Sequence, residues 1–329
     1  MATIRSNKFI VITSIFHPTA AVKKFAALSD YQLIVVGDNK SPLDWQCDGV
    51  IYLSVASQQK LNYPIIKELP YNHYCRKMIG YLFAIEHGAE IIIDTDDDNI
   101  PYENWQFPAF DGEFECIEGD KGFINIYSEF TSQKIWQRGL PLSFINSPNA
   151  YSKLNKNAKI GVWQGLADGD PDVDAIYRLT NNAPCNFNKR MPLIIDKGTI
   201  SPFNSQNTAF VKKLFPLLYL PSFVTFRFTD ILRGIVAQPV MWQADYLLGF
   251  TEATVVQERN VHNYMNDFEQ EIPMYQYAER SYQIALKAVS ETKTVAENLF
   301  NVYEELHRNN EIVNQKEIIL LEKWLKYFN

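Results

Sequence analysis

A run of carboxylates follows a short apolar stretch near residue 90. The residues 91–93 are all isoleucine, and Asp94-Thr95-Asp96-Asp97-Asp98 comes directly after them. Because alternate residues of an extended segment point the same way, we expect Asp96 and Asp98 to share one face. Two carboxylates on one face suit a hard divalent cation, which can take further ligands from a diphosphate. The sequence therefore predicts a Mg²⁺ or Mn²⁺ site at Asp96 and Asp98 that orients a diphosphate.

Three other interpretations of this run are compatible with its first residues. An EF-hand loop opens with the same spacing, but it needs glycine where Asn99 stands and glutamate where Trp105 stands. A solvated turn of aspartates is the ordinary explanation of a charge run. A two-metal phosphatase or nuclease site needs further acidic and histidine ligands, and the chain has 5 histidines. The EF-hand fails both requirements, and the other two interpretations stay open.

The elements around the run predict an α/β sheet. Residues 9–16 and 31–38 are continuous, β-branched stretches typical of buried strands, and residues 91–93 form a third. Apolar residues of Tyr74–His87 recur at helical spacing, and Gly88 follows as a C-cap. Strands alternating with helices imply mainly parallel order, and their carboxyl ends open onto a ligand crevice.

The remainder of the chain predicts a substrate-binding middle and a helical end. Residues 107–207 are rich in glycine, proline, asparagine and aromatics, so we expect short strands and long loops there. Glycine and proline are absent after Pro273, and apolar residues recur at helical intervals. We predict one nucleotide-binding catalytic domain over residues 1–270 and a helical extension over residues 271–329. The extension is expected to serve homo-oligomer formation or membrane-surface docking, or to pack on the catalytic domain.

Composition excludes several classes of protein. The 329 residues are 47% hydrophobic and 21% charged, which argues against disorder, and the net charge of −7 argues against broad nucleic-acid binding. The 4 cysteines form no CxxC pair, and no apolar run is long enough to span a membrane. We therefore expect a cytoplasmic protein, peripheral at most to the inner face of a membrane.

Several motifs together resemble a known family. Tyr31–Asp38, Cys75–Tyr81 and Ile92–Asp98 are similar to segments of the reversibly glycosylated polypeptides, or UDP-arabinopyranose mutases, and of the related STELLO-type proteins. The downstream order is similar too, in Trp136–Ser143, Asp172–Ala175 and Arg227–Ile231. The resemblance covers roughly residues 9–240. It implies a GT-A fold and a nucleotide-diphosphate-sugar donor, most often linked to UDP.

The resemblance also implies roles for the donor side of the crevice. Thr13, Ser14, Asp96 and Asp97 are expected to contact the nucleotide sugar. Asp38 ends the second strand, where a carboxylate of GT-A enzymes contacts the base or ribose; an Asx turn with Asn39 and Lys40 is the alternative role.

Two cations and a histidine complete the expected donor site. Arg76 and Lys77 begin a helix that points into the crevice, where they would meet uracil or the diphosphate, or else form a solvated helix face. His262 is expected as a third metal ligand beside Asp96 and Asp98.

The expected catalytic residues are Asp230, Asp174 and Arg138. Asp230 is a candidate general base, with a helix N-cap as its alternative role. Arg138 matches the family segment that holds a reactive arginine, and Asp174 is expected to bind sugar hydroxyls. Where the family has a tandem acidic pair, this chain has Thr229-Asp230 with one carboxylate.

The sequence thus predicts a metal-dependent glycosyltransferase that transfers a sugar from a UDP-sugar to a glycan or sugar acceptor, as in surface polysaccharide synthesis. A UDP-sugar mutase is the nearest alternative enzyme. A non-catalytic scaffold that keeps the fold is the alternative from a different class.

Overall fold

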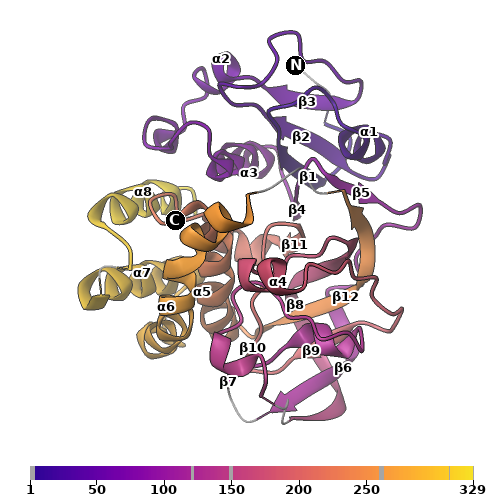
Figure 1. The fold of residues 1–329 in the computed structure, drawn as a ribbon. Coiled ribbons are helices and arrows are strands. Elements are labelled where there is room, and N and C mark those ends of the chain that lie inside the picture. The colour runs from indigo at the N-terminus through magenta and orange to yellow at the C-terminus, as the bar shows by residue number, and fades with distance from the viewer. Residues whose placement is uncertain (1–3, 120–121, 148–150, 259–262, 311, 329) are drawn as a thin grey trace.

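The computed structural model describes most of the chain, and Figure 1 shows its arrangement. A ten-stranded mixed sheet runs through the molecule in the order β3-β2-β1-β4-β11-β8-β6-β9-β12-β5. The described residues are 4–119, 122–147, 151–258, 263–310 and 312–328.

The N-terminal half of the sheet is parallel, as the alternation of strands and helices predicts. Val11 is in register with Ile34 on one side and with Asp94 on the other. Three helices flank these strands, and Gly80 permits the closest approach, because a Cβ there would lie 2.6 Å from Val11 and 2.8 Å from Val36. The elements are β1 (Lys8–Thr13), α1 (Ala20–Ala26), β2 (Gln32–Val36), β3 (Val50–Leu53), α2 (Val55–Gln58), α3 (Lys77–Glu86) and β4 (Ile91–Thr95).

The predicted helix over residues 74–87 has two parts. A 3₁₀ turn, η2 (Tyr74–Arg76), leads into α3, and His73 caps it by accepting from the Cys75 amide at 3.1 Å. After the helix, Gly88 has a φ of +82°, the left-handed conformation that glycine adopts at a helix end. The predicted C-cap is therefore confirmed.

The second half of the sheet closes on itself. Strand β11 lies antiparallel between β4 and β8, and the pairings β8–β6, β6–β9, β9–β12 and β12–β8 form a ring. The strands here are β5 (Asn99–Pro101), β6 (Asp111–Gly119), β8 (Tyr151–Gly169), β9 (Leu193–Ile195), β11 (Asn207–Val211) and β12 (Tyr246–Gln257). A separate pair joins β7 (Gly122–Phe123) to β10 (Thr199–Ile200).

Strand β8 corrects the expectation of short strands in the middle of the chain, because it is 19 residues long. Its first half is polar and mostly exposed, where it pairs with β6, whereas residues 160–167 are buried. Because the two halves of β8 have different hydrophobic patterns, the sequence alone suggests two separate elements instead of one long strand.

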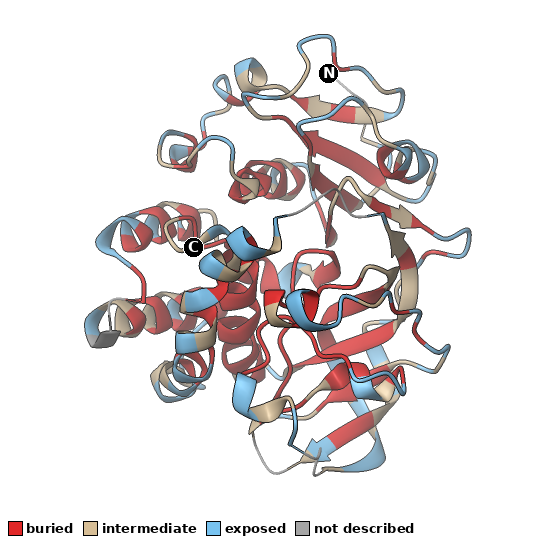
Figure 2. Cartoon of the chain, viewed as in Figure 1, coloured by how far each residue is buried: buried red, intermediate tan, exposed pale blue. Residues whose placement is uncertain are grey.

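Four long helices pack on one side of this half. They are α5 (Thr229–Gln243), α6 (Tyr264–Ala288), α7 (Val295–Asn310) and α8 (Gln315–Leu325), and a short helix, α4 (Ala175–Thr180), contacts α6. Residues 229–242 of α5 are all buried, and Figure 2 shows α5 as the central helix of this group. The predicted domain boundary after residue 270 falls inside α6.

The C-terminal helices join the rest of the chain through an apolar layer. Trp324 and Leu325, two of the apolar residues at helical spacing in the predicted extension, are buried, and the Trp324 Nε1 donates to the Pro216 carbonyl at 2.9 Å. Lys323 forms an ion pair with Glu68. The remaining 3₁₀ helices are η1 (Pro64–Lys67), η3 (Ile126–Glu129), η4 (Leu142–Phe144), η5 (Lys212–Leu218) and η6 (Phe226–Phe228).

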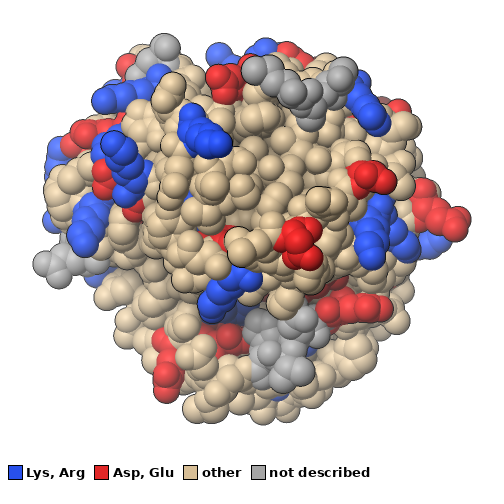
Figure 3. Space-filling model, turned by 90° about the horizontal axis from the view of Figure 1, so that it is seen from above, with Lys and Arg blue, Asp and Glu red and all other residues tan. Residues whose placement is uncertain are grey.

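Charged side chains of both signs are dispersed over the face above the N-terminal strands (Figure 3). Within the described part of the chain, no helix is both long enough and apolar enough to cross a membrane.

Candidate active site

The aspartate run forms a turn between β4 and β5. Strand β4 ends at Thr95, and Asp96, Asp97 and Asp98 all line a cavity of about 230 Å³ at its carboxyl end. The turn is fixed by the Thr19 hydroxyl, which donates to the Asp97 carbonyl at 2.6 Å. Because the residues are not extended, Asp97 lines the same cavity as Asp96 and Asp98, and the expected alternation fails.

A buried ionic cluster lies beneath this turn. The Lys77 Nζ donates to Asp94 at 2.8 Å and to Asp96 at 2.6 Å, and the Arg233 Nη1 donates to the other Asp94 oxygen at 2.7 Å. Burial opposes the charge of Lys77, but the two carboxylates outweigh it and raise the pKa of Lys77 above its usual value. Burial likewise opposes the charge of Asp94, yet Lys77 and Arg233 hold the pKa of Asp94 below its usual value.

Lys77 therefore takes a different position from the one predicted. Its side chain is fully buried and lies behind Asp96, outside the residues that line the cavity. There it neutralises Asp94 and fixes Asp96 by one oxygen, Oδ1. The second oxygen of Asp96 remains available to a ligand, and the Asp96 side chain is 38% exposed.

The pKa values of two turn carboxylates, Asp96 and Asp97, lie above the usual value of an aspartate. Burial raises the pKa of Asp96 to about 7, helped by the nearby charge of Asp98 and opposed by Lys77. Burial also raises the pKa of Asp97 to about 6, although the Ser14 hydroxyl donates to its Oδ2 at 2.5 Å. Because ionising these carboxylates is unfavourable without a counter-charge, a bound cation would stabilise their ionised form.

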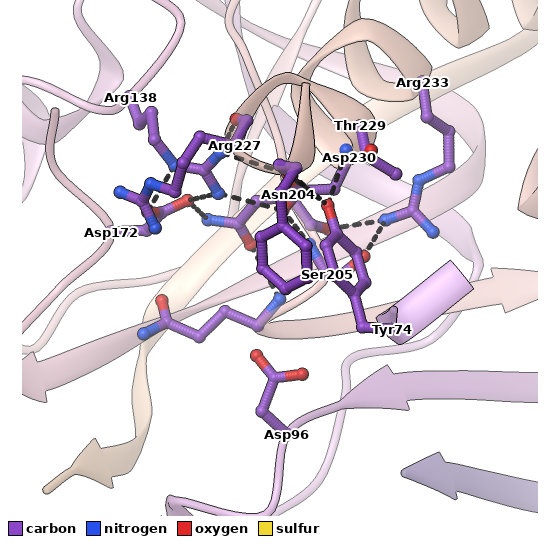
Figure 4. Close-up of polar contacts among 12 residues, drawn as sticks. Tyr74, Asp96, Arg138, Asp172, Asn204, Ser205, Arg227, Thr229, Asp230 and Arg233 are labelled. Atoms are coloured by element: carbon purple, nitrogen blue, oxygen red, sulfur yellow. Dashed lines mark hydrogen bonds and ion pairs between the residues drawn. The ribbon is translucent and has the colours of Figure 1, made fainter. Parts of the chain in front are cut away.

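A second ionic cluster forms the opposite wall, and Figure 4 shows it across the cavity from Asp96. Arg138 lies between Asp172 and Asp230 and donates through Nε and Nη2 to Asp172, at 2.8 Å each. Its Nη1 and Nη2 donate to Asp230 at 3.1 and 3.0 Å, and Nη1 also donates to the Arg227 carbonyl. All five N–H groups of the guanidinium are thus engaged by the protein.

Asp230 is equally engaged. Its Oδ1 accepts from Arg138 and from the Tyr74 hydroxyl at 3.2 Å, and its Oδ2 accepts from Arg138 and from the Ser205 amide at 3.2 Å. Asp230 is the second residue of α5 and its side chain does not cap the helix, because the N-cap is Phe228 and has no side-chain hydrogen bond. The alternative role as an N-cap is therefore excluded.

A second lobe adjoins the first. Its cavity is about 190 Å³ and shares Thr13, Tyr74, Asp97 and Phe226 with the larger lobe. Asp38 lies here at the end of β2, and Ser14 lines this lobe beside Asp97.

The contacts of Asp38 are local. Its Oδ1 accepts from the Asn39 amide at 2.7 Å, and its Oδ2 accepts from the His73 amide at 3.2 Å. Neither bond is the i to i+2 contact of an Asx turn, so Asp38 lies in the crevice with its carboxylate held by the Asn39 and His73 amides.

Two of the predicted site residues lie away from both lobes. Arg76 is buried, where it donates to Gln58 and stacks on Tyr71 at 4.2 Å from the ring centroid. Asp174 is the N-cap of α4 and accepts from the Tyr177 amide at 2.8 Å, and Trp136 donates to its other oxygen. His262, the predicted third metal ligand, lies outside the described residues.

Several residues of the site were not singled out from the sequence. One of them is Asp172, which lines the cavity, whereas the predicted Asp174, two residues later, does not. The signal was available, because an aspartate directly before the helical stretch from Ala175 is typical of an N-cap. Ser205, Gln206 and Gln257 also line the larger lobe, and no local motif marks them, whereas Arg227 lines it from the motif Arg227–Ile231 without having been given a role.

The donor set of the turn fits a hard divalent cation. Asp96 and Asp98 offer carboxylate oxygens, and Mg²⁺ sites in nucleotide enzymes often use one or two carboxylates together with substrate phosphates. Among the described residues, no group of three or more His, Cys, Asp or Glu side chains is placed to hold a metal ion by itself. The arrangement fits a metal that the substrate completes better than a closed structural site.

The fold and the cleft are consistent with the GT-A-like class of glycosyltransferases. No family model matches the chain. Over 264 residues it is 33% identical to the probable glycosyltransferase STELLO2 and 30% identical to the probable glycosyltransferase STELLO1, both from Arabidopsis thaliana. Each match covers 74% of this chain and 34% of the relative, so the chain spans about a third of the length of these curated relatives.

Over that part of the chain, the predicted similarity to STELLO-type proteins is thus confirmed. The two matches do not include a reversibly glycosylated polypeptide or a mutase, so that part of the resemblance stays a prediction.

Proposed function

We propose that this chain is a glycosyltransferase that binds a nucleotide-diphosphate sugar, with UDP as the nucleotide, together with Mn²⁺ or Mg²⁺. A glycan or another sugar is the acceptor. The names of the two relatives support the class of reaction, and the two-lobed cleft at the ends of β1, β2 and β4 supports the donor. The smaller lobe would take the nucleoside, and the larger lobe the diphosphate and sugar.

The charge of the larger lobe is the observation that carries the metal requirement. Five aspartates and two arginines line it, so acidic side chains outnumber basic ones where a diphosphate would bind. An anion enters such a cavity only with a cation. Asp96 and Asp98 would hold that cation, which would neutralise the leaving diphosphate when bound.

The protein's own groups keep this site in one arrangement. Lys77 and Arg233 hold Asp94 and Asp96 in place, and Arg138 holds Asp172 and Asp230 on the facing wall. Asp230 remains the candidate general base, and in that role an acceptor hydroxyl must replace one of its four hydrogen-bond donors. Sugar hydroxyls would meet the amide side chains of Gln206 and Gln257 at the same cavity.

UDP is expected to raise the melting temperature only when Mn²⁺ or Mg²⁺ is present. At a ligand concentration of about 100 times Kd, the increase should be roughly 4 °C for a chain of this size. Thermal-shift measurements with UDP alone, Mn²⁺ alone, both together, and both with EDTA test this. Asp96→Asn should abolish the joint effect, and Asp111→Asn, at an exposed strand start, should leave it intact. Equal stabilisation by UDP in EDTA would contradict the metal requirement.

A further inference from the structure

Arg227 is a cation of the larger lobe that the proposed function does not yet use. It belongs to η6, immediately before α5, and lines the cavity with a side chain that is 13% exposed. Its Nε and Nη2 both donate to one oxygen of Glu271, at 3.0 and 2.8 Å. Among the described residues, no hydrogen-bond partner is placed on its Nη1.

The two cavity arginines therefore differ in what they can still bind. Arg138 donates to Asp172, to Asp230 and to the Arg227 carbonyl. Asp172 and Asp230 are themselves part of the cavity lining. Arg227 has its carboxylate partner outside the lining, on α6. An anion in the cavity thus meets a free guanidinium edge only at Arg227 among the described lining arginines.

Glu271 holds this arginine from the C-terminal helices. It is fully buried on α6, and its second oxygen accepts from the Ala175 amide and from the Tyr275 hydroxyl, at 2.7 Å each. The Thr225 hydroxyl adds a bond from the same loop to the Gln270 carbonyl at 2.7 Å. Glu271 thus connects η6, the start of α4 and its own helix in a single buried contact.

We infer that Arg227 binds the phosphate groups of the donor and that Glu271 is the residue that positions it. This rests on the proposed function. The guanidinium presents a planar pair of donors, which suits phosphate oxygens, and Glu271 fixes the opposite edge of that plane. Because Glu271 lies in α6, the C-terminal helices contribute to the donor site and are more than an outer layer.

The test compares a phosphate ligand with one that lacks phosphate. Binding of pyrophosphate and of UDP, each with Mn²⁺, is measured by titration calorimetry, and uridine binding by ligand-observed NMR. Arg227→Gln should weaken pyrophosphate and UDP at least tenfold and leave uridine unchanged. Arg227→Lys should recover part of the loss, because charge is kept without the planar fork. Arg280→Gln, the same change on the exposed face of α6, should bind like the wild type.

The positioning role has its own readout. Glu271→Gln should weaken pyrophosphate less than Arg227→Gln does, and the double variant should be no weaker than Arg227→Gln, because both changes remove one interaction. Glu279→Gln on the exposed side of α6 is the control. Should Glu271→Gln fail to fold, Tyr275→Phe removes one of its hydrogen bonds and should give a smaller loss in the same direction.

The outcomes distinguish the phosphate-binding role of Arg227 from the proposal that the donor is a nucleotide sugar. If Arg227→Gln binds pyrophosphate and UDP like the wild type, or loses uridine equally, the phosphate role of Arg227 is wrong while the donor proposal stands. If pyrophosphate binds through Arg227 but UDP and uridine do not bind, the anion site stands and the nucleotide donor is wrong. Failure of the wild type to bind any of the three overturns both.

Discussion

At the scale of single residues, the site depends on three buried cations that neutralise aspartates. Lys77 and Arg233 share Asp94, and Arg138 is placed between two carboxylates. A buried ion pair contributes little net stability, but removing one member leaves an uncompensated charge and costs several kcal/mol. These side chains therefore fix the shape of the cavity, whether or not they contact substrate.

Asp230→Asn is expected to lower the free energy of unfolding by about 3 kcal/mol. Arg138 would keep only Asp172 as an ionic partner, and the asparagine NH₂, in either orientation, would face two of the four groups that now donate to Asp230. Urea denaturation measures the change. Asp245→Asn removes the exposed pair with Lys197 and should have little effect. If Asp230→Asn were as stable as the wild type and only sugar transfer were lost, the general-base role would be favoured over a positioning role.

The carboxylates of the site show how far sequence reasoning reaches. The position of the aspartate run after a buried strand predicted that Asp96 and Asp98 would meet at the end of the sheet, and both line the cavity. The choice of Asp174 over Asp172 depended on which of two nearby aspartates faces inward. That depends on where α4 begins and on the distant Arg138, which the local sequence does not specify.

At the scale of elements, the loop before α5 is held by two carboxylates from the C-terminal helices. Glu271 of α6 binds η6 at one end. At the other end, Glu317 of α8 accepts from the Ser222 and Phe223 amides, at 3.0 and 2.8 Å, and from the Tyr219 hydroxyl. The position of Phe226 and Arg227 in the cavity thus depends on helices that follow them in the chain.

Glu317 gives the protein a pH dependence of stability. Burial raises the pKa of Glu317 to about 7, against the hydrogen bonds that it accepts. The folded state therefore binds this proton more tightly than the unfolded state does. The contribution is fully present below about pH 4.5, is lost as the pH rises toward 7, and totals roughly 3 kcal/mol.

Glu317→Gln isolates this effect, because the carboxyls of Asp96, Asp97 and Asp174 shift in the same direction and stay in place. The stability deficit of the variant should be largest near pH 4.5 and should shrink until about pH 7. Urea denaturation between pH 4.5 and 8.5 measures it. Glu322→Gln, exposed on the same helix, should run parallel to the wild type. A deficit that is constant with pH would mean that Glu317 ionises normally.

The elements that the sequence predicted are those with a clear local period. The parallel strands of the N-terminal half and α3 follow the predicted positions within a few residues, because their apolar patterns and the glycine after the helix are local signals. The closed ring of β6, β8, β9 and β12 was not predicted. Its pairings join residues far apart in the chain, such as Glu115 with Leu193, and no local pattern encodes them.

At the scale of the whole molecule, the C-terminal helices are continuous with the core. Helix α7 packs on α5 and on η5, and α8 contacts η1 of the N-terminal half. The apolar stripe that ends near Trp324 is covered by the chain itself, as in the predicted packing on the catalytic domain. Association or membrane docking through other surfaces of these helices stays a prediction.

This continuity revises what a truncation is expected to do. Removal of the chain after Pro273 would take away Trp324, Tyr303 and Glu317, all of which are buried against the remaining part. A helical extension that lies outside the catalytic domain, as the sequence predicts, would leave a truncated domain that still binds donor. Because these contacts would be lost, we expect the fragment 1–273 to lack a cooperative unfolding transition.

A single substitution tests the same point in the full chain. Trp324 is fully buried, its ring packs near Tyr219 and Phe328, and its indole N–H donates to Pro216. Trp324→Ala should lower the free energy of unfolding by about 3–5 kcal/mol, because it leaves a cavity between α8 and the core and an unpaired carbonyl. It should also shift the transitions of the whole chain together, since the helices share one core with the sheet.

Tryptophan fluorescence is unsuitable for this comparison, so far-UV circular dichroism and the donor-dependent thermal shift are followed during urea denaturation. Ile319→Ala, at a residue 40% exposed on the same helix, should stay within about 0.5 kcal/mol of the wild type. A Trp324→Ala variant in which the helices unfold first, while UDP with Mn²⁺ still stabilises the remaining fold, would show that the extension is an independent unit. In that case the donor site would not need the helices, and the role assigned to Glu271 would fall with it.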